Sequence, residues 1–102
     1  MRFLVVATPK TTPPPELIPS LIDRLEEWQQ RYADAGKFEA FGLFPSGGGF
    51  AVADLSDEAE LHRMILEMPF SPFSDHQITA IVDPATGLRQ SREVFAAMMA
   101  SA

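Results

Sequence analysis

The sequence predicts an α+β domain in which two helices cover one face of a four-stranded antiparallel sheet. Three observations lead to this class. The chain has 102 residues, 46% of them hydrophobic and 22% charged, which is typical of one globular domain. Four short apolar runs alternate with two amphipathic segments in the order strand, helix, strand, strand, helix, strand. Because right-handed crossovers place both helices on the same side of the sheet, this order predicts a ferredoxin-like fold over residues 1–102.

The first half of the chain contains one strand and the longer helix. A strand is expected over residues 2–8, followed by a stiff proline-rich connection over 9–16. The helix that follows ends at Gly36, a residue type typical of the position just after a helix. Its apolar stripe recurs at spacings of three and four residues and is formed by Leu21, Leu25, Trp28 and Tyr32.

The second half of the chain is expected to contain a β-hairpin, then a second helix and a last strand. Strands are expected over 37–44 and 50–55, joined by a glycine-rich turn. Ser56 is the expected N-cap of the second helix, whose buried stripe comprises Leu61, Ile65 and Met68. The last strand is expected over 76–82, and after a turn a short final helix is expected over 91–100.

Two Pro-Phe pairs, Pro69-Phe70 and Pro72-Phe73, separate the second helix from the last strand. Proline disfavours both a helix interior and a central strand, so this aromatic loop is expected to be irregular. Its two rings either fill the core or line a pocket.

Apolar side chains occupy both faces of the predicted sheet. In the first strand Phe3, Val5 and Ala7 alternate with Leu4 and Val6. In the second strand Phe38, Ala40 and Phe44 are expected opposite Phe41 and Leu43, and in the third Phe50 and Val52 opposite Ala51, Ala53 and Leu55. Two helices cover only one face, so a second copy is expected to cover the other. The predicted assembly is a homodimeric α+β barrel, alone or within a larger ring.

The charge pattern argues against several classes of partner. The formal net charge is −6, and the eight cations are scattered along the chain, which disfavours nucleic acid. No apolar run approaches the roughly 20 residues that span a membrane. The chain has no cysteine and two isolated histidines, so neither disulfides nor a metal site are expected, and the cytoplasm is the expected compartment.

The stretch "LHRMILEMPFSPFSDHQITAIVDP", residues 61–84, resembles the corresponding part of muconolactone isomerases and their dehalogenating relatives. The shared features are Leu-His in the helix, the double Pro-aromatic loop, the strand and the later proline. The resemblance extends without gaps back to about residue 20. It implies a dimeric α+β barrel that assembles into rings, and a cofactor-free proton shift on an unsaturated lactone.

Two positions depart from that family. The family's acid in the first helix, thought to move the proton, is matched by Arg24, with Asp23 beside it. The family's Trp-Arg pair in the second strand is matched by Phe41 and Gly42. Loss of this cation argues against an anionic lactone as the substrate.

A cofactor-free proton shift needs a base whose pKa lies near the working pH. Five residues are candidates, but one of them, Asp75, is expected to be a turn or cap residue, which leaves four. His62 matches the family and flanks the core stripe, while His76 is expected at the start of the last strand, beside the aromatic loop. Glu39 alternates with an aromatic residue on the sheet, and Asp23 is positioned to replace the missing helix acid. Each also has a structural interpretation as a solvated, paired or hydrogen-bonded side chain.

The end of the sheet and the two helices are expected to form a cleft, and aromatic side chains are expected to form its wall. These are Trp28, Tyr32, Phe41, Phe70 and Phe73. Three functions remain open from the sequence: an isomerase of the muconolactone type, another cofactor-free enzyme such as a quinone-forming monooxygenase or polyketide-tailoring enzyme, and a non-catalytic ligand-binding or assembly protein. The first two require a small-molecule substrate.

Overall fold

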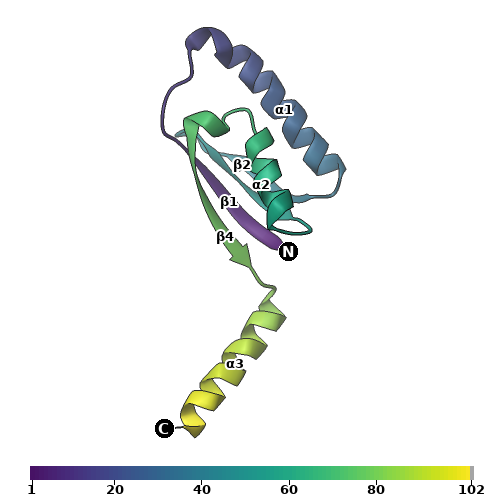
Figure 1. The fold of residues 1–102 in the computed structure, drawn as a ribbon, viewed down its shortest axis with the longest axis vertical. Helices are drawn as coiled ribbons and strands as arrows, with labels where there is room; N and C mark the ends of the chain where they lie inside the picture. Colours follow the sequence, from purple (N-terminus) through teal and green to yellow (C-terminus); the bar gives the residue numbers. More distant parts are fainter. Residues whose placement is uncertain (102) are drawn as a thin grey trace.

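A computed structural model describes residues 1–101 and contains one antiparallel sheet with two helices packed on it. The strand order is β2-β3-β1-β4, so β2 and β4 form the edges. The main elements are β1 (Arg2–Pro9), α1 (Ile18–Asp34), β2 (Phe38–Leu43), β3 (Gly49–Asp54), α2 (Glu58–Glu67), β4 (Ser74–Ile81) and α3 (Pro84–Ala100). Figure 1 shows α1 and α2 over the sheet, with α3 extending away from it. This arrangement confirms the predicted α+β class.

The core lies between this sheet face and the two helices. Strand residues such as Phe3 and Ala53 share one buried cluster with Trp28 of α1 and Met64 of α2. Met64 is only 1% exposed, more buried than the predicted stripe residue Ile65. Gly36 adopts φ +70° just after α1, the conformation for which the sequence predicted a glycine there.

A β-bulge changes the predicted alternation in β2. Phe38 pairs with Ala53 and Phe41 with Ala51, and the register shifts between Phe38 and Ala40. Because the bulge adds one residue, Phe38 and Phe41 share the helix-covered face instead of opposite faces. Their rings stack with centroids 5.7 Å apart. Strict period-two alternation was therefore wrong for this strand.

The N-termini of α2 and α3 also differ from the prediction. Asp57, not Ser56, caps α2, since its carboxylate accepts a hydrogen bond from the backbone N–H of Glu60 at 2.9 Å. α3 begins at Pro84, where a turn was expected, because Asp83 accepts from the N–H of Thr86 at 3.0 Å and Pro84 suits the first turn.

The aromatic loop is more regular than expected. Residues Ser71–Phe73 form one turn of 3-10 helix with Pro72 in its first positions. β4 then begins at Ser74, because pairing with β1 continues to Pro9. His76 therefore lies inside the strand rather than at its start, and Asp75 is a strand residue rather than a turn residue.

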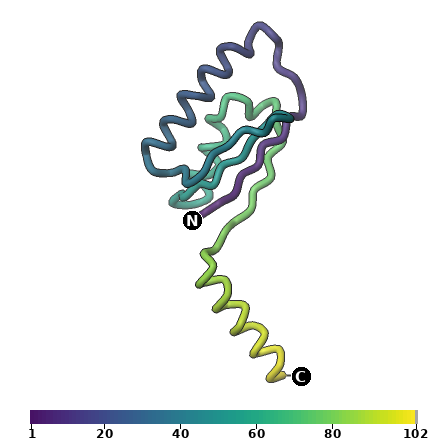
Figure 2. The backbone as a smooth tube through the Cα atoms, turned by 180° about the vertical axis from the view of Figure 1, so that it is seen from behind, coloured from purple at the N-terminus to yellow at the C-terminus, as the bar shows by residue number. Residues whose placement is uncertain are grey.

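The second face of the sheet and α3 have no covering element among residues 1–101. Leu4, Val6, Phe50 and Val52 lie on that sheet face, opposite the buried residues of the same strands. α3 has no buried residue, and in both ribbon and tube views it points away from the body (Figures 1 and 2). Within these residues no helix is long and apolar enough to cross a bilayer.

Candidate functional site

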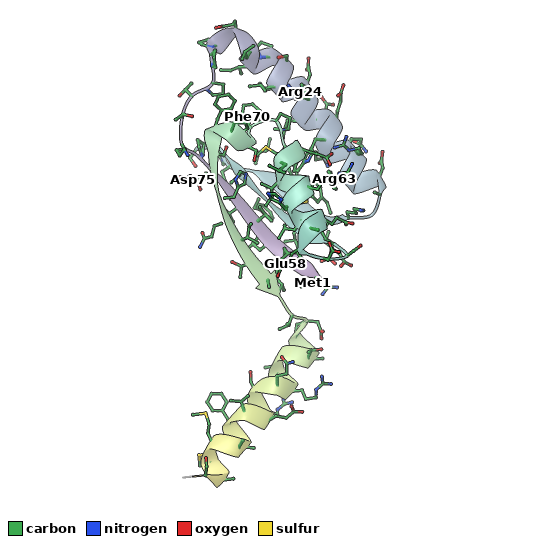
Figure 3. The ribbon with its side chains drawn as sticks, viewed as in Figure 1. Met1, Arg24, Glu58, Arg63, Phe70 and Asp75 are labelled. Carbon is green, nitrogen blue, oxygen red and sulfur yellow. The ribbon has the colours of Figure 1, made fainter. Side chains whose placement is uncertain are left out.

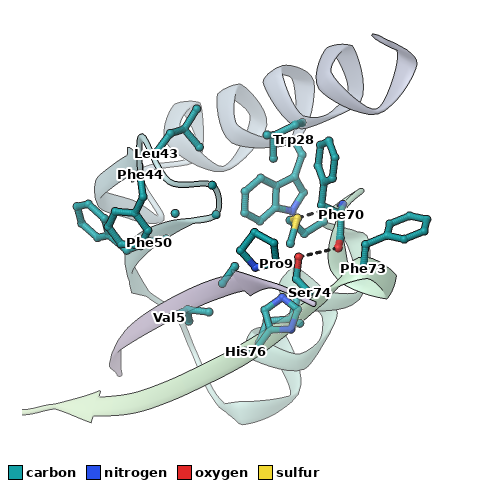
Figure 4. A pocket seen from close by; sticks show the side chains of 18 of the residues that line it. Val5, Pro9, Trp28, Leu43, Phe44, Phe50, Phe70, Phe73, Ser74 and His76 are labelled. Carbon is teal, nitrogen blue, oxygen red and sulfur yellow. Dashed lines mark hydrogen bonds between the residues drawn. The ribbon is translucent and has the colours of Figure 1, made fainter. Parts of the chain in front are cut away.

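A cavity of about 550 Å³ opens at the end of the sheet where β1 runs into the proline-rich connection and β4 begins. α1, α2, the β2–β3 hairpin and the aromatic loop complete its wall. Figure 3 shows the side chains of the whole molecule, and Figure 4 shows this cavity from close by. Its volume lies in the range of small-molecule sites.

Four of the five predicted wall residues line the cavity. They are Trp28, Phe41, Phe70 and Phe73. The indole N–H of Trp28 donates to the carbonyl of Met64 at 3.1 Å, which fixes the ring and leaves an apolar surface. Tyr32 does not line the cavity; it packs in the core, 5.6 Å from Trp28 between ring centroids, and burial raises the pKa of its hydroxyl.

The aromatic loop is held by a chain of short-range hydrogen bonds. The N–H of Ser71 donates to the carbonyl of Met68 at 3.0 Å, and that of Phe73 to Phe70 at 2.9 Å. The Ser74 hydroxyl also donates to the Phe70 carbonyl, at 3.0 Å (Figure 4). Met68 is buried in the core cluster and Phe70 packs against it, so this part of the cavity wall is anchored to the core.

The mouth of the cavity is built by two loops. The backbone N–H groups of Lys10 and Thr11 both donate to the carbonyl of Phe73, at 2.9 and 3.2 Å, and tie the proline-rich connection to the aromatic loop. On the other side Gly48 approaches the carbonyl of Ala7 so closely that a Cβ atom there would clash with it. Its φ of +78° likewise favours glycine.

His76 is the titratable side chain in this wall. It lies on the helix-covered face of β4, two residues after Ser74, and both line the cavity. Its Nε2 atom is buried and has no hydrogen-bond partner among residues 1–101. Burial lowers the pKa of the imidazole below its ordinary value, and the neighbouring Asp75 opposes this effect. A neutral imidazole with a free nitrogen can accept a proton or a hydrogen bond from a ligand.

The other three candidate bases lie outside this cavity. His62 is exposed on α2. Glu39 is exposed in the β2 bulge and accepts a hydrogen bond from Nε of Arg2 at 2.7 Å, so the acid on the sheet is paired. Asp23 is exposed on the outer side of α1, in a shallow polar groove with Glu26 and Glu27. The structure therefore does not bring the four candidates together.

The cavity wall within residues 1–101 contains no Asp, Glu, Lys or Arg side chain. Its polar side chains are the hydroxyls of Thr11, Thr12 and Ser74 and the imidazole of His76. Gly42, which matches the family's arginine, has the Phe50 ring where its side chain would be, since a Cβ there would lie 2.5 Å from that ring. Across the same residues no group of three or more His, Cys, Asp or Glu side chains could hold a metal ion.

Several wall residues were missed from the sequence. These are Pro9, Thr11, Thr12, Pro13, Ile22, Leu25, Phe44, Phe50, Met64 and Met68. The proline-rich connection offered a signal, because it joins the end of the first strand to the start of the first helix, the end of the sheet at which the aromatic loop also lies.

Comparison with solved structures identifies the fold. One crystal structure of muconolactone isomerase superposes with a TM-score of 0.72 over 82% of this chain and 92% of that chain, at 22% sequence identity. The chain has the muconolactone isomerase fold. This confirms the fold that the resemblance of residues 61–84 implied.

A second structure has the same fold and a known ligand. It is the 5-chloro-2-hydroxyhydroquinone dehydrochlorinase of Burkholderia phenoliruptrix AC1100 in complex with 2,5-dihydroxybenzoquinone, with a TM-score of 0.60 at 15% identity, covering 84% of this chain and 98% of that chain. No protein-family model and no curated protein sequence matches this chain. The same fold is thus found in an isomerase and in a dehydrochlorinase.

Proposed function

We propose that this protein is a small-molecule enzyme that catalyses a cofactor-free proton shift on an enolisable ring, with His76 as the base. The observation that supports this most is that His76 lines an apolar cavity and that its buried Nε2 atom has no protein partner within residues 1–101. A buried polar atom without a partner is costly, so a ligand that pairs with it is favoured.

The proposed step balances without an external reagent. The Nε2 lone pair removes a proton from a ring carbon next to a carbonyl, which gives an enolate and an imidazolium. The imidazolium then returns the proton to another carbon of the conjugated system. Because a charged imidazole is disfavoured by the same burial that lowers its pKa, the return of the proton is favoured. Thr11 and Thr12 line the cavity, and their hydroxyls are the proposed donors to the enolate oxygen.

The other three candidate bases lie away from the cavity. Glu39 already pairs with Arg2, and His62 and Asp23 point to solvent away from the cavity. They take no part in the proposed step. Trp28, Phe41, Phe70 and Phe73 are the proposed substrate-binding residues, and Tyr32 supports Trp28 from the core.

The assembly proposed with this function is a homodimer, or a ring built from such dimers. The support is the uncovered sheet face, where Leu4, Val6, Phe50 and Val52 are only partly buried, together with four exposed apolar side chains of α3, namely Val94, Phe95, Met98 and Met99. A second copy would cover both surfaces. The absence of cysteine keeps the cytoplasm as the proposed compartment.

Deuterium exchange tests the reaction. β-Tetralone, a neutral enolisable ketone, is incubated with the protein in deuterated buffer, and loss of the proton signal next to the carbonyl is followed by NMR. The protein should accelerate exchange, and His76→Asn should abolish the acceleration. The control variant His62→Asn, at the exposed histidine, should exchange as fast as the unaltered protein. Full exchange activity in His76→Asn would refute the proposed base.

A further inference from the structure

The wall of the cavity restricts the charge of its ligand. Every side chain that lines it within residues 1–101 is uncharged at neutral pH, apart from the titratable His76, whose burial favours the neutral form. An ionised carboxylate placed there would lose its hydration without gaining a cation. The ion pairs of the surrounding surface, such as Arg2–Glu39 and Lys37–Glu60, have both partners outside the cavity wall.

The size of the cavity restricts the ligand further. A volume of about 550 Å³ is much larger than a single six-membered ring requires. The apolar rings of Trp28, Phe41 and Phe70 line the cavity from α1, from β2 and from the aromatic loop. A flat ligand of two or more fused rings would contact all three, whereas one ring would leave part of the wall against water.

The polar groups lie together on one side of this wall. Ser74 and His76 share one face of β4, and Thr11 is tied to the carbonyl of Phe73 immediately before that strand. A ligand whose fused rings lie among the aromatic side chains would therefore direct one hydroxyl or carbonyl toward this side, where Nε2 of His76 lacks a partner.

We propose that the substrate is an uncharged, fused-ring phenol or ketone, held by the aromatic wall and oriented by one hydrogen bond between its oxygen and His76. The proposal rests on the proposed function of this cavity but names the class of molecule bound. It excludes an anionic single-ring lactone as the preferred substrate.

Calorimetric titration of the full chain with four probes tests this class. β-Naphthol and β-naphthoic acid share two fused rings and differ in charge at neutral pH, and phenol and benzoic acid form the single-ring pair. β-Naphthol should bind more than about tenfold more tightly than β-naphthoate, because the carboxylate lacks a cation. It should also bind more than about tenfold more tightly than phenol, because the second ring buries further apolar surface.

A variant at the rim provides the matched control. Ile22 lines the cavity and is 52% exposed, so a long polar side chain fits there without disturbing the core. Ile22→Arg should tighten β-naphthoate binding about tenfold, whereas the uncharged Ile22→Gln should not. Failure of Ile22→Arg to favour the carboxylate over Ile22→Gln would contradict the charge argument.

The outcomes separate the substrate class from the reaction. The proposed class would be overturned if β-naphthoate bound the unaltered protein as tightly as β-naphthol or more tightly. It would also be overturned if phenol bound as tightly as β-naphthol, or if none of the four probes bound. If β-naphthol is preferred but β-tetralone exchange is not accelerated, the class stands and the proposed reaction fails. If exchange is accelerated but the binding preference is absent, the reaction stands and the class fails.

Discussion

The burial of His76, the proposed base, makes the stability of the protein depend on pH. Because burial lowers the pKa of this imidazole in the folded protein below its ordinary 6.5, the unfolded chain takes up a proton first as the pH falls. The free energy of unfolding should therefore decrease as the pH falls below about 6.5, and this contribution should level off below the folded pKa.

His76→Asn removes that titration while keeping a polar side chain. Denaturant unfolding measured at intervals between about pH 7 and 5 should show a smaller loss of stability in the variant than in the unaltered protein. Carboxylates that titrate at lower pH remain the same in both proteins, so the difference reports His76. An identical pH dependence in both would show that burial does not perturb this imidazole.

The two rings of the aromatic loop differ in how much they support the fold. Phe70 packs against the core cluster although partly exposed, whereas Phe73 lines the cavity without belonging to that cluster. A fully enclosed Phe typically costs about 3–5 kcal/mol when changed to Ala. Phe73→Ala should cost clearly less than this and less than Phe70→Ala, while β-naphthol binding weakens.

Chemical denaturation and calorimetry on the two variants check this expectation. Losses in the full core range for both rings would show that the loop fills the core instead of lining a pocket.

The N-terminus of α2 allows the effects of two neighbouring residues, Asp57 and Ser56, on helix stability to be compared. Asp57 accepts the hydrogen bond from the Glu60 N–H, while the hydroxyl of Ser56 lies 3.3 Å from the Glu60 carboxylate on the exposed surface. Asp57→Ala should lower the free energy of unfolding by about 1 kcal/mol, and Ser56→Ala by much less. Thermal or denaturant unfolding of both variants measures this, and a larger loss from Ser56→Ala would restore the cap expected from the sequence.

The order and type of the elements followed from hydrophobic period and turn residues, but their details did not. The bulge places Phe38 and Phe41 on the same face of the sheet. It cannot be recognised from the alternation of apolar residues in β2, because it is defined by how β2 pairs with Ala53 and Ala51 of β3. Similarly, Asp83-Pro84 is compatible with a turn or a helix start, and the choice depends on how the chain leaves β4.

The candidate site could be predicted only where local sequence marks a residue, and not where it depends on contacts between distant segments. Phe70 and Phe73 were found because proline marks their loop, and Trp28 because it belongs to the apolar stripe of the first helix; all three reach the cavity. The role of the proline-rich connection depends on hydrogen bonds from Lys10 and Thr11 to Phe73, which are more than 60 residues apart in sequence. The distinction between His62 and His76 likewise depends on burial, which sequence spacing alone does not give.

At the scale of the whole molecule, the uncovered sheet face and α3 predict association. Val6 lies within β1, an interior strand of the sheet, on the uncovered face, paired with Phe50 and Gln77 of the neighbouring strands. Val6→Lys should place a charge in the proposed interface and shift the dimer toward monomer, because an unpaired buried charge is costly.

Light scattering at micromolar concentration measures the mass of each protein. Leu66→Lys is the matched control, since Leu66 is exposed on α2 in the opposite layer and its variant should remain dimeric. A compact, folded monomer of the unaltered protein would contradict the proposed assembly.

NMR of the histidine ring nitrogens detects whether a ligand in the aromatic cavity forms a hydrogen bond with His76. The chain has two histidines, so the exposed His62 serves as an internal control. Addition of β-naphthol should shift the His76 Nε2 signal as its unpaired nitrogen gains a hydrogen bond, while the His62 signals stay in place. Saturable binding of β-naphthol with an unchanged His76 signal would show that the ligand does not pair with this imidazole.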